Sequence, residues 1–209
     1  MKKIFIMVLS AVCLLSLAKA QYQTPPSYYG QPRPQQNYSR PLYFHPDGSE
    51  LSVGIEGALP LGGWDDGYNS KVASVGFGAT LKYGYNFNAV NAITLESGCL
   101  YFPGNDLGGA KINSTLIPIK LGWRGSIQNF YFEPQLGVNF LDASAKATDG
   151  LYGSAYGSAT GFAYALGIGF FVSRNFDVNL KFERFSNSDG AFTFLALRLA
   201  YVFPLSHRR

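Results

Sequence analysis

Apolar residues alternate with small or polar residues from about residue 50 to residue 203, and this two-residue period restricts the fold more than any other feature. Phe162, Tyr164 and Leu166, for example, are separated by Ala163 and Ala165. Because side chains two residues apart lie on one face of a β-strand, each such segment predicts a strand with one apolar face. We expect eight strands, at about 50–60, 73–86, 91–102, 112–124, 129–141, 159–173, 177–186 and 191–203.

The connections between these segments differ in length. They are short at 86–90, 125–128, 174–176 and 186–190, and long and rich in Gly, Asp and Asn at 61–72, 103–111 and 142–158. Bacterial outer-membrane barrels have short periplasmic turns and longer extracellular loops. The sequence therefore predicts an all-β fold, an eight-stranded antiparallel up-and-down transmembrane β-barrel over residues 48–203, with both ends of the barrel domain on the periplasmic side.

The first twenty residues have the form of a signal peptide. Met1-Lys2-Lys3 precedes an apolar run over 4–17, and Ala18-Lys19-Ala20 has the small-x-small pattern that signal peptidase cuts. We expect export to the outer membrane, with cleavage near Ala20-Gln21. Removing this leader from 17 basic and 13 acidic residues leaves 14 and 13. A nearly neutral chain argues against a nucleic-acid partner.

Residues 21–47 are rich in Pro, Gln and Tyr and contain almost no aliphatic residues. Such a composition cannot bury a core and predicts a disordered periplasmic tail. The alternative is a docking segment for a partner, because Tyr22, Tyr28, Tyr29 and Tyr38 could stack. Residues 204–209 form a short C-terminal extension after the last expected strand.

The placement of the charged residues along the strands indicates which face of the barrel contacts lipid. A soluble lipocalin-like barrel would carry many charges along its outer surface, but here the strand charges share the small, polar face. All eight Asp fall in the tail, a loop or a turn. We therefore expect a polar lumen and a lipid-facing apolar surface. The expected lumen residues are Glu56, Lys82, Glu96, Lys120, Glu133, Lys181, Glu183 and Arg198.

The spacing of these charges around the short turns predicts how they pair. Lys82 and Glu96 lie nearly equidistant from the turn at 86–90, and Lys120 and Glu133 from the turn at 125–128, so each pair should lie opposite in its hairpin. If the first and last strands close the barrel with Leu51 beside Phe203, Arg198 faces Glu56. Buried charges need partners, so we expect an ionic network that plugs the lumen.

Aromatic residues are concentrated near the two ends of the expected strands, as interfacial anchoring requires. The expected girdle residues are Tyr83, Tyr85, Trp123, Phe130, Phe132, Tyr201 and Phe203 on the turn side, and Tyr101 and Phe140 on the loop side. Pro118 and Pro134 fall inside strands, although a closed barrel has no edge strand for proline. Because they lie nearly opposite each other across one hairpin, we expect a shared bulge.

This combination resembles the small outer-membrane β-barrel proteins of the OmpA/OmpX-like class, a porin-family type of β-barrel domain. The resemblance rests on the signal peptide, the amphipathic strands, the glycine-rich lumen, the strand Ile117-Pro118-Ile119-Lys120-Leu121-Gly122-Trp123 and the aromatic-ended last strand, 195–203. It implies insertion by the outer-membrane assembly machinery, which reads the final strand. The residues 204–209 after Phe203 are a departure from the usual aromatic terminus.

The sequence offers no catalytic constellation, so we expect no enzymatic activity, no metal and no cofactor. Its two histidines, His45 and His207, lie outside the expected strands on the periplasmic side. The adjacent Asp65 and Asp66 lack the wider spacing of a calcium loop. Cys99, on an apolar face, is expected to be inert.

The leading interpretation is a structural or surface-interaction protein, anchored in outer-membrane lipid, that meets an unknown extracellular partner through the loops 61–72 and 142–158. The first alternative is a narrow porin-like channel for small solutes, although eight strands leave a lumen just wide enough for side chains. The second alternative is a soluble ligand-binding barrel, which requires the apolar face to point inward.

Overall fold

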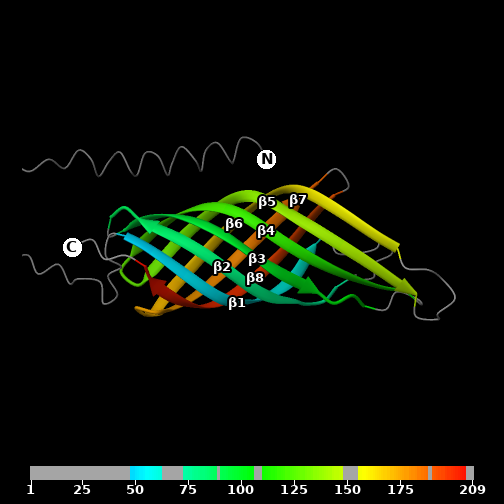
Figure 1. Ribbon diagram of the computed structural model, residues 1–209, viewed down its shortest axis with the longest axis horizontal. Helices are drawn as coiled ribbons and strands as arrows, with labels where there is room; N and C mark the ends of the chain where they lie inside the picture. Colours follow the sequence, from blue (N-terminus) through cyan, green and yellow to red (C-terminus); the bar gives the residue numbers. More distant parts are fainter. Residues whose placement is uncertain are drawn as a thin grey trace, which may run out of the picture. The chain divides into compact units, whose positions relative to one another are not determined.

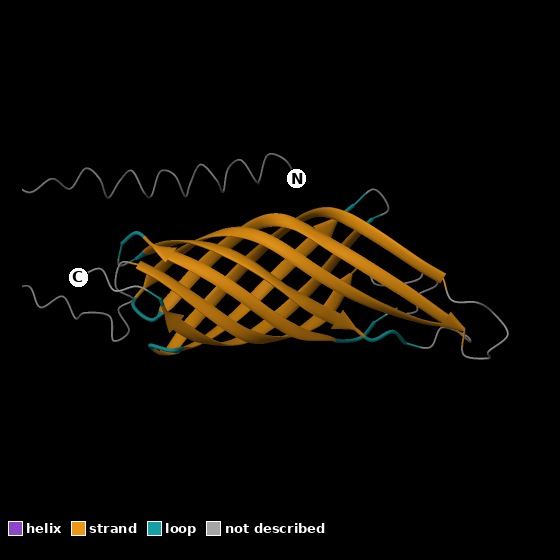
Figure 2. Cartoon of the chain, in the orientation of Figure 1, coloured by secondary structure: helices purple, strands orange, loops and turns teal. Residues whose placement is uncertain are grey.

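A computed structural model describes residues 48–62, 73–88, 90–105, 110–147, 155–187 and 190–205. It contains eight strands that form a closed antiparallel barrel (Figures 1 and 2). The strands are β1 (Gly48–Gly62), β2 (Gly76–Asn86), β3 (Asn91–Phe102), β4 (Ala110–Ile127), β5 (Phe130–Ala147), β6 (Ala155–Ser173), β7 (Phe176–Ser186) and β8 (Ala191–Pro204). The expected signal peptide, tail and loop segment 63–72 lie outside the described residues, as do both histidines.

Each strand pairs with its sequence neighbours, and β1 pairs with β8 to close the barrel. In this closing ladder Leu51 lies opposite Phe203, as expected from the sequence. No helix of the described residues is long and apolar enough to cross a membrane.

The alternating pattern has its apolar face on the outside. Along β8, Ala196, Arg198 and Ala200 are buried, whereas Leu197 and Leu199 between them are 49% and 46% exposed. A soluble ligand-binding barrel requires the apolar side chains of the strands to point inward. Here they point outward, so that alternative is wrong. The expected polar-inside arrangement is confirmed.

Strands β5 and β6 are longer than expected, and the expected long loop at 142–158 is wrong in its bounds. Pairing continues to Ala145 opposite Ala155, so only residues 148–154 lie between the two strands. The outward residues of this extension, such as Asp142 and Thr160, are polar, and the hydrophobic alternation therefore ends before the backbone pairing does. Figure 1 shows β5 and β6 reaching beyond the other strands at the loop end of the barrel.

The two strand prolines do not share a bulge, so that expectation is wrong. Pro118 lies opposite Asn139 and Pro134 opposite Leu166. Each proline instead coincides with a gap in one ladder: β3–β4 pairing skips the positions beside Pro118, and β4–β5 pairing skips those beside Pro134. A proline has no N–H to donate, and the barrel accommodates each one by interrupting pairing on one side only.

Candidate functional site

All eight sequence-predicted lumen residues lie inside the barrel, and none is more than 3% exposed. They come from seven strands: Glu56 from β1, Lys82 from β2, Glu96 from β3, Lys120 from β4, Glu133 from β5, Lys181 and Glu183 from β7, and Arg198 from β8. Each occupies an inward position of its strand, because it falls in the polar half of the two-residue period. The structure therefore gathers the predicted set in one interior.

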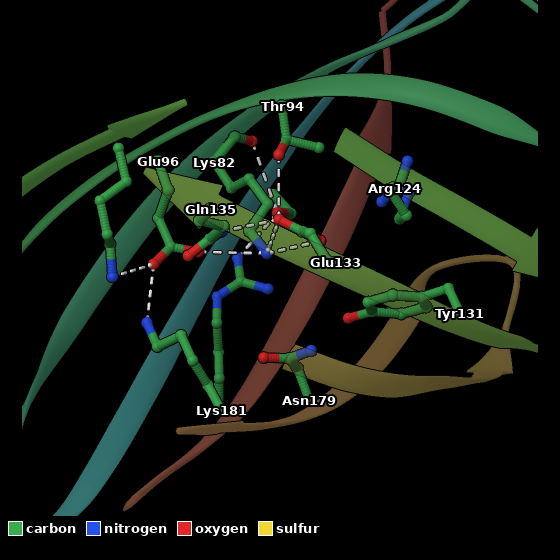
Figure 3. Close-up of polar contacts among 12 residues, drawn as sticks. Lys82, Thr94, Glu96, Arg124, Tyr131, Glu133, Gln135, Asn179 and Lys181 are labelled. Atoms are coloured by element: carbon green, nitrogen blue, oxygen red, sulfur yellow. Dashed lines mark hydrogen bonds and ion pairs between the residues drawn. The ribbon is translucent and has the colours of Figure 1, made fainter. Parts of the chain in front are cut away.

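Lys181 is the centre of this set. Its Nζ lies 2.7 Å from Oε1 of Glu96, 3.0 Å from Oε1 of Glu56 and 3.6 Å from Oε2 of Glu183. Strands β3 and β7 are four positions apart in the closed order of eight, so the contact to Glu96 crosses the lumen. Figure 3 shows Lys181 and Glu96 approaching each other from different strands.

Two further lysines join the carboxylates into one network. Lys82 lies opposite Glu96 in the β2–β3 register, as the turn spacing predicts, and its Nζ is 3.1 Å from Glu96 and 3.0 Å from Glu133. Lys120 contacts Glu96 at 3.2 Å and also forms an ion pair with Glu183. The ammonium groups thus alternate with carboxylates, which offsets the cost of burying charge.

The expected pairing of Lys120 with Glu133 is wrong. Lys120 lies opposite Gly137 in the β4–β5 ladder. The hairpin turns at 128–129, so its centre lies two residues later than that of the expected turn at 125–128, and Gln128 takes the left-handed conformation there, with φ 57°. This displacement of the turn shifts the register, and Glu133 bonds instead to Lys82 across the lumen.

Arg198 lies opposite Glu56 in the β1–β8 register, as expected, but its guanidinium has other partners. It donates hydrogen bonds to Asp177 at 3.0 Å, to Thr80 at 2.8 Å and to Ser52 at 2.7 Å. The expectation that all Asp lie outside the strands is therefore wrong, because Asp177 is a buried residue of β7. Its position, four residues before Lys181 on the same face, is the signal that could have identified it.

A second ion pair near the turn end was missed from the sequence. Arg124 of β4 pairs with Glu50 of β1, and it donates a hydrogen bond to Asn86 at 3.1 Å. The guanidinium lies 5.6 Å from the ring centre of Tyr131 and 5.4 Å from that of Phe171, so it also makes cation–π contacts. Glu50 and Arg124 fall at the ends of their expected strands. There it is hardest to predict from the sequence whether a side chain points into the lumen or outward.

The loop end of the interior is apolar. Phe102 and Phe194 are fully buried, with ring centroids 5.8 Å apart in an edge-to-face arrangement. The buried cluster comprises Ala58, Ala73, Leu100, Phe102, Leu116, Phe194 and Ala196, with Leu141 and Phe192 packed against it. The described interior thus has an Arg124 layer at the turn end, an ionic layer in the middle and an apolar layer at the loop end.

The nine expected girdle residues all lie on the outer surface, between 37% and 63% exposed. At the turn end, the ring centroids of Tyr201 and Phe203 are 4.6 Å apart and those of Phe176 and Tyr201 are 5.2 Å apart. At the loop end Tyr101 packs edge-on against Phe77 at 5.7 Å. Amphipathic rings in such positions can bind the headgroup region of a bilayer.

Little else in the described part of the chain carries chemistry. Cys99 is a free thiol on the outer surface. Among the described residues, no group of three or more His, Cys, Asp or Glu side chains could hold a metal ion. The adjacent Asp65 and Asp66 lie outside those residues.

Solved structures with a similar fold are outer-membrane barrels. Ail, the attachment invasion locus protein of Yersinia pestis, is 20% identical, with a TM-score of 0.59 over 76% of this chain and 100% of Ail. The N-terminal β-barrel domain of Pseudomonas aeruginosa OprF is 11% identical, with a TM-score of 0.54 over 74% of this chain and 97% of that domain. At these identities the likeness shows the fold.

The family assignment comes from the sequence match. No curated protein sequence matches the chain significantly. The family model described as "Outer membrane protein beta-barrel domain" matches residues 8–203, which is most of the chain. The chain therefore belongs to the family of outer membrane protein β-barrel domains and is a small β-barrel protein of the bacterial outer membrane.

Proposed function

We propose that this protein is a non-enzymatic membrane anchor with a closed lumen, which presents its loop end to partners outside the cell. The observation that carries this proposal is the contact of Lys181 with Glu96 across the lumen, in a network that includes Lys82, Lys120 and Glu133. A channel needs a continuous water-filled path. Eight strands leave an interior that side chains can fill, and the ionic and apolar layers of the described interior support that outcome.

The outer surface supports the anchoring role. Exposed large apolar residues cover every strand, for example Leu121 at 59% and Ile168 at 58%. An apolar band of this kind is stabilised by lipid. We infer that the expected insertion by the outer-membrane assembly machinery, directed by the strand ending at Phe203, applies to this chain.

The loop end of the barrel supports the proposed binding of partners outside the cell, because the extended ends of β4, β5 and β6 place polar residues beyond the apolar band. One similar structure is of Ail in complex with the heparin analogue sucrose octasulfate, at 22% identity and a TM-score of 0.57 over 74% of this chain and 97% of Ail. The same fold therefore carries a ligand-binding surface in Ail. We propose that residues 63–72 and 148–154, with the ends of the strands that flank them, carry one here.

Cysteine labelling of intact cells tests this orientation. In a Cys99→Ala background, a membrane-impermeant maleimide should label Ser158→Cys at the loop end and should label Asn129→Cys at the turn end only after lysis. Ser158 is exposed and Asn129 is half-buried, so labelling of each variant after lysis supplies the control for the reactivity of its thiol. Labelling of Asn129→Cys in intact cells, with Ser158→Cys protected, would overturn the proposal.

A further inference from the structure

The buried charges of the described interior do not balance. Six carboxyl residues are buried there, but only five residues with a cationic group. The carboxyl groups belong to Glu50, Glu56, Glu96, Glu133, Asp177 and Glu183, and the cationic groups to Lys82, Lys120, Arg124, Lys181 and Arg198. With all of these groups ionised, the described interior has one negative charge in excess.

The ion pairs locate this excess in the middle of the barrel. Arg124 pairs with Glu50, and Arg198 pairs with Asp177, so both of these pairs are balanced. Four carboxyl groups then share three ammonium groups. We call this set the central ionic layer, and it consists of Glu56, Glu96, Glu133, Glu183, Lys82, Lys120 and Lys181. The other titratable groups that face it are the two balanced pairs and Tyr131, and β6 contains no charged residue.

Glu56 has the fewest donors of the four carboxyl groups. Its only ion-pair partner among the described residues is Lys181, which also contacts Glu96 and Glu183. Arg198 lies opposite Glu56 in the β1–β8 ladder but donates its hydrogen bonds to three other residues. Lys181 donates to Oε2 of Glu56 at 3.2 Å, whereas Oε1 accepts no hydrogen bond from the described residues. The excess carboxylate is therefore best assigned to Glu56.

Two carboxamide side chains beside the layer also have an oxygen without a donor. Gln135 donates to Glu96 at 3.2 Å and to Glu133 at 2.7 Å, but its Oε1 accepts no hydrogen bond from the described residues (Figure 3). Asn139 donates to Glu183 at 2.8 Å, and its Oδ1 is likewise without a described donor. Both side chains are at most 3% exposed. A buried acceptor without a donor costs free energy, so this region is short of donors as well as of positive charge.

Polar inward positions lead to the layer from the turn end. Along β1, the buried residue on the turn side of Glu56 is Ser52, and the buried residue on its loop side is Ala58. At the loop end, the fully buried rings of Phe102 and Phe194 lie above the layer. A small cation would therefore reach the layer from the turn end, which is the periplasmic side in the expected orientation.

We propose that the central ionic layer takes up one additional single positive charge when the barrel folds, either a proton or an alkali cation. This inference goes beyond the proposed anchoring function. A buried charge without a partner is costly enough that it is paired or neutralised. Carboxylate and carboxamide oxygens are ligands for hard cations, and a carboxylate can instead accept a proton. One positive charge balances the layer, whereas a divalent ion would reverse the imbalance.

Unfolding of the full-length protein in lipid vesicles tests this proposal in two arms. In the first arm, in choline chloride, the pH is raised from about 6, where unfolded carboxyl groups are already ionised. A proton held only by the folded barrel makes the unfolding equilibrium constant rise about tenfold per pH unit, so stability falls as the pH rises. In the second arm, potassium or sodium chloride replaces choline chloride at constant pH and ionic strength. A bound alkali cation makes the unfolding constant fall about tenfold for each tenfold rise in its concentration.

Glutamine variants show whether the bound charge belongs to this layer. Glu56→Gln removes the excess carboxylate at nearly constant size, so it should abolish whichever dependence the unmodified protein shows. Glu133→Gln changes the charge of the layer equally and replaces Glu56→Gln if that variant does not fold. Glu50→Gln is the matched control, because it removes a carboxylate from the balanced pair with Arg124 and should retain the dependence.

Comparison among these proteins cancels the titration of groups that all of them share. A pH dependence that Glu56→Gln abolishes identifies a proton, and an alkali dependence that it abolishes identifies a bound cation. The proposal is overturned if neither dependence differs between the unmodified protein and Glu56→Gln. It is also overturned if Glu50→Gln abolishes the dependence as completely as Glu56→Gln does.

Discussion

The ammonium of Lys181 lies 2.7 Å from Oε1 of Glu96, although the two residues belong to strands on opposite walls of the barrel. Both side chains are buried, at 1% and 0% exposure. Cross-lumen contacts of this kind link walls that share no backbone hydrogen bonds, so the network stabilises the closed cross-section of the barrel as well as its own charges.

Removing the central ammonium should destabilise the barrel. In Lys181→Met, the carboxylates of Glu56 and Glu96 lose a shared partner, and an uncompensated buried charge costs about 3–5 kcal/mol. Urea unfolding in lipid vesicles, followed by heat-modifiable gel migration, measures the change. Lys111→Met, at an exposed position of β4, is the control and should change the free energy of unfolding by less than about 0.5 kcal/mol. Equal stability of the two variants would contradict a structural role for the network.

The contact between Lys181 and Glu96 should appear as a coupling energy. The double variant Lys181→Met with Glu96→Gln should be more stable than the sum of the single changes predicts, by about 0.5–3 kcal/mol, because removing both charges leaves fewer unpaired groups than removing one. The cycle of Lys181→Met with the outer-face change Leu121→Ala should be additive within about 0.5 kcal/mol. Additivity in both cycles would show that Lys181 and Glu96 do not interact in the folded barrel.

The close approach of β4 and β5 should make one inward glycine intolerant of a side chain. A Cβ on Gly137 would lie 2.0 Å from the carbonyl oxygen of Ile119, where only backbone could move. Gly137→Ala should therefore lower the free energy of unfolding by about 1–3 kcal/mol. Gly57→Ala is a matched control on the outer face, where nothing lies within 4 Å of the added carbon, and should be nearly neutral. The register is refuted if the two variants unfold alike.

The outer surface should distinguish lipid-facing from water-facing positions. Leu121→Arg, in the apolar band of β4, should destabilise the protein by about 2–4 kcal/mol in vesicles. Thr160→Arg, on the polar extension of β6, should cost about 0–1 kcal/mol. If the two substitutions lowered the free energy of unfolding equally, the apolar band could not end between Leu121 and Thr160 as we describe.

The two-residue period of the sequence predicts the strands and shows that their charged side chains point into the lumen. The short turn at 86–90 predicts that Lys82 lies opposite Glu96. The Lys120–Glu133 pair was predicted wrongly, since an error of two residues in the position of a turn changes every partner in the hairpin. The partner of Arg198, Asp177, was missed because a lone Asp beside a short turn looks like a turn residue.

Contacts across the lumen could not be predicted from local patterns. Whether Lys181 meets Glu96 depends on strand tilt and stagger around the whole barrel, to which every turn contributes. The extension of β5 and β6 was missed for a different, local reason: its outward residues Asp142, Ser158 and Thr160 are polar, so no apolar stripe marks these strand ends.

Conductance of the purified full-length protein in planar lipid bilayers tests the closed lumen most directly. The account predicts no steady current steps in molar potassium chloride at protein levels where a general diffusion porin gives them. Heat-modifiable migration of the same sample confirms that the barrel is folded. Steady, reproducible current steps from that folded sample would contradict the account, because ions would then be passing the contact between Lys181 and Glu96.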